Sequence, residues 1–147
     1  VEPIEQIATD RHRLDSYTPV FAANQYSLFP ETPYRFKRFV KTNGYANMPL
    51  DGLWLRAPYL HNGSVPSLRD LLEPAANRPP AFYRGNDVYD PVKLGFVSDL
   101  PEANGKKLFR LDTTVPGNGN GGHEGKAYGT ELSAAEKTAL VEFLKTF

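Results

Sequence analysis

Three side chains of this sequence are the first candidates for a nitrogen or sulfur ligand of a metal ion: the imidazoles of His61 and His123 and the thioether of Met48. His123 lies in a loop rich in glycine and asparagine, TTVPGNGNGGHEGKAYG, ten residues before Ser133. Glycine tolerates positive φ, so this backbone can approach a flat ligand closely. An imidazole held there offers a free lone pair to a metal. The pattern favours His123 as a metal ligand, and the alternative is an exposed or backbone-bonded loop histidine.

Met48 is the alternative metal ligand, because a thioether followed by Pro49 in an irregular segment could reach a metal. A single methionine beside Leu50 and Leu53 is, however, more often core-filling. His61 has two readings that stay open: a buried structural histidine, or one at the edge of a bound cofactor.

These residues must be positioned by a long central segment, GYANMPLDGLWLRAPYLHNGSVPSLRDLL, which runs from Gly44 to Leu72. Proline and glycine interrupt it too often for one regular element. Its leucines, tyrosine and single tryptophan are nevertheless too apolar for a solvated loop. Such a segment usually wraps another domain or a large, flat, apolar ligand.

The central segment resembles the C-terminal haem-domain segment of dihaem c-type cytochromes, the group of rubber oxygenases and, more distantly, bacterial cytochrome c peroxidases. The resemblance continues through FYRG, DPVKLGF, the His123 loop and the final ELSAAEKTALVEFLKTF. It implies a mainly α, cytochrome c-like domain with few helices, long irregular loops and at most a small β-ribbon. Residues 44–147 would form the C-terminal part of this haem domain, and residues 1–43 a lead-in segment that packs on the rest of a longer protein.

The resemblance also implies functional residues. His123 would be the distal axial ligand of the haem iron, with Met48 as the alternative. Four residues would contact the porphyrin or its propionates: Trp54, Arg56, Tyr59 and His61. Calcium is a further possible ion, since relatives bind it at a domain interface and this chain offers oxygens at Asp112, Asn118, Asn120 and Glu124.

The sequence contains no cysteine, which excludes disulfides, thiolate metal sites and the C-x-x-C-H motif that attaches haem c. The attachment motif is therefore expected in an upstream part of the same protein or in a companion chain. The resemblance implies a periplasmic or secreted haem-dependent oxidoreductase, peroxidase- or oxygenase-like, with a redox partner. This segment alone would not be catalytic, and its substrate stays open among peroxide, polyisoprene and electron transfer alone. The alternative is a haem-less binding or assembly module descended from the same family.

Composition bounds the remaining possibilities. The 147 residues suit one domain, and 17 basic and 17 acidic residues balance to zero formal charge. A neutral chain is a poor ligand for nucleic acid, whose phosphates require a positive face. No apolar run has the length of a membrane span.

Three regular elements are expected around the loops. The first is a helix over Ser64–Glu73, ended by Pro74. The second is a strand within 107–112 that pairs with 81–84 as a small ribbon. The third is a terminal helix that begins at Ser133, where Glu136 completes a capping box. Its apolar face is expected to comprise Ala139, Leu140, Phe143, Leu144 and Phe147.

Overall fold

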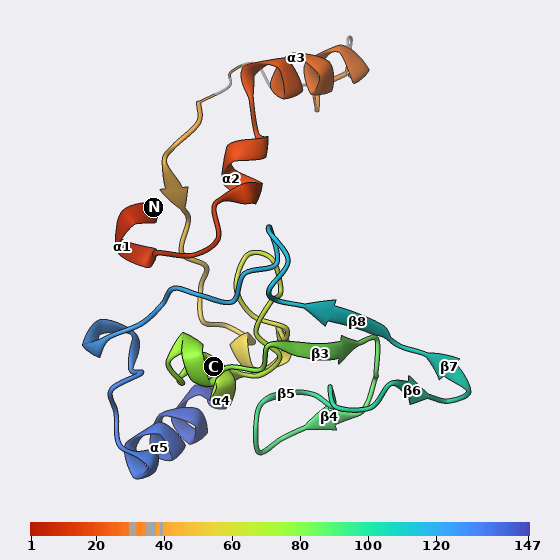
Figure 1. The fold of residues 1–147 in the computed structure, drawn as a ribbon. Helices are drawn as coiled ribbons and strands as arrows, with labels where there is room; N and C mark the ends of the chain where they lie inside the picture. The colour runs from red at the N-terminus through yellow and green to blue at the C-terminus, as the bar shows by residue number, and fades with distance from the viewer. Residues whose placement is uncertain (30–31, 35–37, 39) are drawn as a thin grey trace.

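The computed structural model describes residues 1–29, 32–34, 38 and 40–147. Its helices are α1 (Ile4–Ile7), α2 (His12–Ser16), α3 (Pro19–Leu28), α4 (Leu68–Leu71) and α5 (Ala134–Leu144). Its strands are β1 (Glu2–Pro3), β2 (Gly44–Tyr45), β3 (Ala81–Arg84), β4 (Tyr89–Asp90), β5 (Gly95–Phe96), β6 (Glu102–Ala103), β7 (Lys106–Lys107) and β8 (Phe109–Asp112). Short 3₁₀ turns occur at Leu53–Leu55, Ala75–Asn77 and Lys126–Tyr128. In Figure 1, α2 and α3 extend away from a body that contains α4, α5 and the longer strands.

The expectation of a mainly α fold is wrong, because the described residues form a mixed α and β domain. Their strands pair as four antiparallel two-stranded sheets: β1–β2, β3–β8, β4–β5 and β6–β7. The reason is the density of turn residues, which stops most helices within one or two turns. The interrupted backbone then satisfies its N–H and C=O groups by pairing across short turns.

The predicted ribbon is confirmed. Strand β3 pairs with β8 in antiparallel register, with Ala81 opposite Asp112 and Arg84 opposite Phe109. Phe82 and Leu111 lie opposite each other, and both are buried. The alternation of apolar and polar residues in this stretch therefore places one face of the ribbon against the body.

The helix predicted over 64–73 is shorter than expected, since α4 spans only Leu68–Leu71. Pro66 disfavours a helical conformation for the residue before it. Val65 instead makes an antiparallel bridge with Tyr59. Ser67 becomes the N-cap, and its hydroxyl accepts a hydrogen bond from the Asp70 N–H at 3.1 Å.

The terminal helix begins as predicted, with the capping box between Ser133 and Glu136. Its predicted apolar face is only partly right. Leu140 and Leu144 pack against the core, but Phe143 is 57% exposed and the fully buried positions are Lys137 and Val141. The Lys137 ammonium lies 2.8 Å from the Glu73 carboxylate, and this ion pair turns the helix toward the end of α4.

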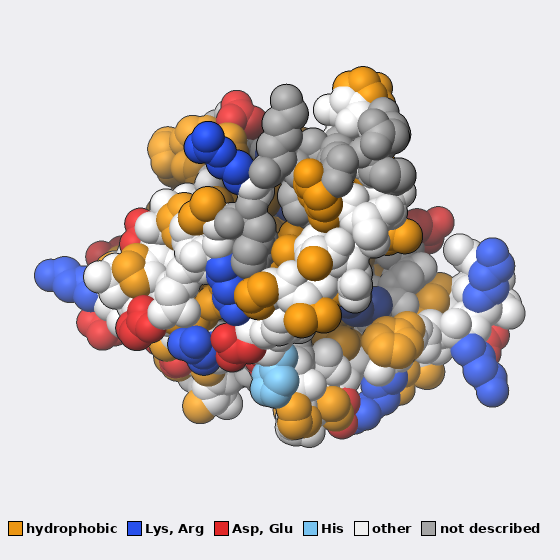
Figure 2. All heavy atoms as spheres, turned by 90° about the horizontal axis from the view of Figure 1, so that it is seen from above, with side chains coloured by type: hydrophobic (Ala, Val, Ile, Leu, Met, Phe, Trp, Pro, Cys, Tyr) orange, Lys and Arg blue, Asp and Glu red, His pale blue; other side chains and the backbone are white. Residues whose placement is uncertain are grey.

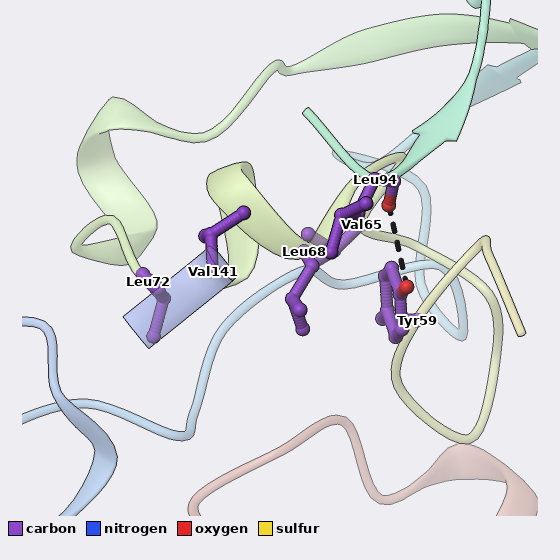
Figure 3. Packing of buried hydrophobic residues seen from close by; sticks show 6 residues of the cluster. All are labelled: Tyr59, Val65, Leu68, Leu72, Leu94 and Val141. Atoms are coloured by element: carbon purple, nitrogen blue, oxygen red, sulfur yellow. Dashed lines mark hydrogen bonds between the residues drawn. The ribbon is translucent and has the colours of Figure 1, made fainter. Parts of the chain in front are cut away.

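The core lies where α4, α5 and the central segment meet. Figure 3 shows its six fully buried members: Tyr59, Val65, Leu68, Leu72, Leu94 and Val141. The Tyr59 hydroxyl donates to the Leu94 carbonyl at 3.2 Å and to the Leu53 carbonyl at 3.0 Å. This small core fixes one wall of the cavity described below.

The surface carries charges of both signs, interspersed with hydrophobic side chains on the face shown in Figure 2. Within the described ranges, we find no helix that is long and apolar enough to cross a membrane.

Candidate functional site

A cavity of about 620 Å³ opens between the central segment, the N-terminal residues and the His123 loop. Its volume falls in the range typical of cofactor and ligand pockets. The lining combines His61, His123, Arg56 and Met48 with polar and apolar neighbours: Ile7, Thr9, Tyr45, Ala46, Asn47, Pro49, Leu50, Leu53, Pro58, Tyr59, Leu60 and Leu71. Two half-buried histidines, 62 positions apart in sequence, therefore line one cavity.

His123 is held rigidly by its backbone. It adopts a positive φ of 53°, and its N–H donates to the Ile7 carbonyl at 2.9 Å. Gly122 has a φ of +84°, and a Cβ on it would lie 2.5 Å from the Ile7 carbonyl oxygen. Only glycine allows the loop to approach the N-terminal segment this closely.

The His123 imidazole is prepared to act as a neutral ligand. Its Nδ1 is enclosed and has no hydrogen-bond partner among the described residues. The residue lines the cavity. The ring stands edge-on to Tyr128, with centroids 5.0 Å apart. Burial lowers the pKa of His123, and the charge of Arg78 and the nearby His61 lower it further, so the ring keeps its lone pair at neutral pH.

His61 lies on the other part of the same lining. Its ring stacks on Tyr45 at a centroid distance of 4.3 Å and an interplanar angle of 17°. Its carbonyl accepts a hydrogen bond from Arg13 Nη1 at 2.7 Å. Nε2 is enclosed, again without a partner in the described part of the chain. Burial is the main cause that lowers the pKa of His61.

These lowered pKa values predict how stability depends on pH. The unfolded chain takes up protons on His61 and His123 below about pH 6.5, while the folded chain resists them. The free energy of unfolding of the haem-free protein should therefore not be lowered by these two histidines above that pH. It should then fall on acidification, by at most about 1.4 kcal/mol per pH unit for each histidine.

Urea unfolding, repeated between pH 7.5 and 5 in steps of about half a pH unit, measures this slope. His61→Phe keeps a ring to stack on Tyr45 but cannot titrate, so it should flatten the dependence. An identical slope in wild type and variant would contradict the assignment.

Of the other predicted site residues, some line the cavity and one does not. Met48 lies at the cavity with 71% of its surface exposed. Arg56 also lines the cavity, but its guanidinium donates to the carbonyls of Pro49 and Asp51. Tyr59 contributes its ring to the wall. Trp54 is not among the lining residues; its indole N–H donates to the Phe147 carbonyl at 3.0 Å.

The loop that carries His123 is anchored at several points. The Asp10 carboxylate accepts from the backbone N–H groups of Gly117, at 3.1 Å, and Gly119, at 3.3 Å. The Asn62 side-chain amide donates to the carbonyls of the same two glycines. A flexible linker would not be fixed in this way, so the loop is a built part of the site.

Two of the four residues considered for calcium use their carboxylates elsewhere. Asp112 accepts from Thr114, and Glu124 accepts from the Ala75 N–H at 2.8 Å. The described ranges contain no cluster of three or more histidine, aspartate or glutamate side chains that could hold a metal ion.

Two elements of the site escaped sequence reasoning. Tyr45, the stacking partner of His61, stands at the start of the central segment and carries no motif. Arg78 stands in the connector ANRPP, which suggests an exposed turn, yet it is 3% exposed and donates into the His123 loop. Neither residue had a signal in the sequence, because the site residues that they contact lie more than 15 positions away.

The donor set fits a haem iron better than a hydrated cation. Two imidazoles with lowered pKa and a thioether line a mostly apolar cavity, and each imidazole has a buried ring nitrogen without a partner among the described residues. Imidazole and thioether are the usual axial ligands of haem c, whereas calcium and magnesium require several oxygens.

Comparison with known proteins finds relatives that match about seven tenths of this chain. The protein y4iJ of Sinorhizobium fredii (strain NBRC 101917 / NGR234) is 47% identical over 108 residues, which cover 69% of this chain and 17% of y4iJ. The protein y4iM of the same strain is 44% identical over 118 residues, which cover 70% of this chain and 27% of y4iM. The chain thus spans less than a third of either relative, both of which are described as uncharacterized.

A family model identifies the segment that carries the signature. Residues 44–84 match the family described as RoxA-like, cytochrome c-like. This span contains His61, Arg56 and the cavity wall, and the sequence around it has no cysteine. The predicted resemblance to c-type cytochromes is therefore confirmed for residues 44–84, which carry a RoxA-like, cytochrome c-like sequence without the motif that attaches haem.

Proposed function

We propose that this chain is the C-terminal portion of a periplasmic or secreted dihaem c-type oxidoreductase. In this proposal, residues 44–147 enclose an electron-transfer haem whose thioether attachment lies outside the sequence. His123 supplies the distal axial ligand. Catalysis on peroxide or another oxidisable substrate would take place at a second haem, and a redox partner would exchange electrons with this one.

One observation carries the proposal: His123 reaches the same cavity as the family-matching segment. The cavity lining includes residues 45–50 and 58–61 from that segment and His123 from a loop more than 60 positions later. The loop is fixed by the bond from the His123 N–H to Ile7 and by the Asp10 carboxylate. Such anchoring supports an imidazole that must meet a metal in one orientation.

The residues of this chain would each perform a physical task. The haem, when bound, supplies one-electron redox chemistry. His123 presents a neutral imidazole because burial lowers its pKa. Leu50, Leu53 and Tyr59 exclude water from the cavity wall. Arg56 braces the turn over 49–56 through its two backbone hydrogen bonds.

The test is an absorption spectrum of the protein purified from its native source, together with a haem stain under denaturing conditions. We expect an intense Soret band, a sharp α band after reduction with dithionite, and a stained band that survives denaturation. Protein that is colourless and unstained in native material would overturn the proposal and favour the haem-less binding module instead.

A further inference from the structure

Arg78 is a buried arginine for which the described residues show five hydrogen bonds and no ion pair. It follows the 3₁₀ turn Ala75–Asn77 and is 3% exposed. A guanidinium has five N–H donors in a fixed planar fork. Each of the five is used here, and each acceptor is a backbone carbonyl.

The five acceptors belong to two segments. Nε donates to the Glu73 carbonyl at 2.9 Å, and Nη2 donates to the Leu71 carbonyl at 3.2 Å, both at the end of α4. Nη1 donates to the Asn120 carbonyl at 2.5 Å and to the Gly122 carbonyl at 2.8 Å. Nη2 also donates to the His123 carbonyl at 3.3 Å. The guanidinium thereby joins α4 to the loop that carries the imidazole.

We propose that Arg78 is a positioning residue for His123. Its guanidinium fixes the 120–123 backbone against α4, so that the imidazole is held toward the cavity. The proposal rests on the function proposed above in one respect: that function identifies the group to which His123 binds. Arg78 itself does not line the cavity, so it acts through the loop and not on a bound group.

The geometry explains why arginine is required. A lysine ammonium has three donors and no planar fork, so it could bond at most three of the five carbonyls. The others would be left buried without a donor, which is costly. Arg78→Lys therefore keeps the charge but weakens the link between the two segments, and Arg78→Met removes both. Arg69→Met is the control, because Arg69 makes only a 3.4 Å bond to Thr138 and a 3.9 Å ion pair with Glu73.

The first measurement is amide hydrogen exchange in the full-length protein that contains this chain, which needs no haem. The reporter is the His123 N–H, which donates to Ile7. Reference amides are Tyr83, bonded to Ser98, and Lys137, bonded to Ser133. In both Arg78 variants we expect His123 to exchange at least ~10-fold faster while the references change little. Uniform acceleration of all three amides, or none, would overturn a positioning role.

The second measurement is the spin state of the haem in the same protein. Both Arg78 variants should gain a high-spin fraction that added imidazole converts back to low spin, and Arg69→Met should not. A fully low-spin spectrum in Arg78→Met would overturn the proposal. Faster local exchange in a protein that contains no haem would leave the positioning of His123 supported and would instead reject the proposed function.

Discussion

Replacing His123 by alanine is expected to abolish the low-spin spectrum of the haem proposed for this domain. The proposed distal ligand is the imidazole of His123, which lines the cavity. Without it the iron loses one strong-field ligand, and the high-spin form should dominate in both oxidation states. Electronic absorption and electron paramagnetic resonance measure the change, and added imidazole should reverse most of it.

Two matched variants make this result specific. Met48→Leu removes the rival thioether, and His61→Phe removes the second imidazole of the cavity while keeping a ring to stack on Tyr45. Both should keep the low-spin spectrum. If His123→Ala stays low-spin while Met48→Leu does not, the axial ligand is Met48 and the assignment is wrong.

The substitution Gly122→Ala is expected to release the His123 loop from the N-terminal segment. The added Cβ would lie 2.5 Å from the Ile7 carbonyl oxygen and 2.6 Å from the Thr9 nitrogen, both backbone atoms that cannot rotate away. The residue also has a φ of +84°. We expect the free energy of unfolding to fall by about 2–4 kcal/mol, from strain and overpacking together. Urea unfolding monitored by circular dichroism measures the loss.

The glycines of the chain provide controls for each cause. Gly105 has a φ of +72°, and a Cβ added to it would meet no atom within 4 Å, so Gly105→Ala measures the conformational strain alone. Gly121 has no such contact and no positive φ, so Gly121→Ala should be nearly neutral. A Gly122→Ala loss no larger than that of Gly105→Ala would show that the close approach to Ile7 contributes nothing.

Local sequence signals predicted the local features of this fold. The capping box at Ser133 and Glu136 needs only residues three positions apart, and it is confirmed. The alternation within 107–112 predicted a strand there, and the pairing of β8 with β3 is also confirmed. The capping box and the alternation depend on neighbours in sequence, which is why the sequence shows them.

The misjudged features leave little pattern in the sequence or depend on partners far along the chain. The sheets β1–β2, β4–β5 and β6–β7 have strands of two residues, which are too short to show any alternation. Lys137 on α5 is buried in an ion pair with Glu73, 64 positions away. The mainly α expectation came from the family resemblance and not from periodicity. It failed because the turn residues of this chain stop most of its helices within one or two turns.

The candidate site divides in the same way. The composition of the central segment and the His123 loop indicated which residues could meet a cofactor, and His61, His123, Met48, Arg56 and Tyr59 do line one cavity. Trp54 instead packs beside Tyr89, with ring centroids 6.2 Å apart. The anchoring by Asp10 and Arg78 had no signal, because a buried polar contact leaves no pattern until both of its partners are known.

The clasp between the His123 loop and the first ten residues has a consequence for how the protein can be divided. Ile7 and Thr9 line the cavity, and Asp10 holds Gly117 and Gly119. A fragment cut at residue 44, where the family signature starts, would keep the histidine and lose the wall on which its backbone is seated. The span recognisable by homology is thus smaller than the unit that must fold together. Truncations planned from homology alone would separate the His123 loop from the N-terminal residues that hold it.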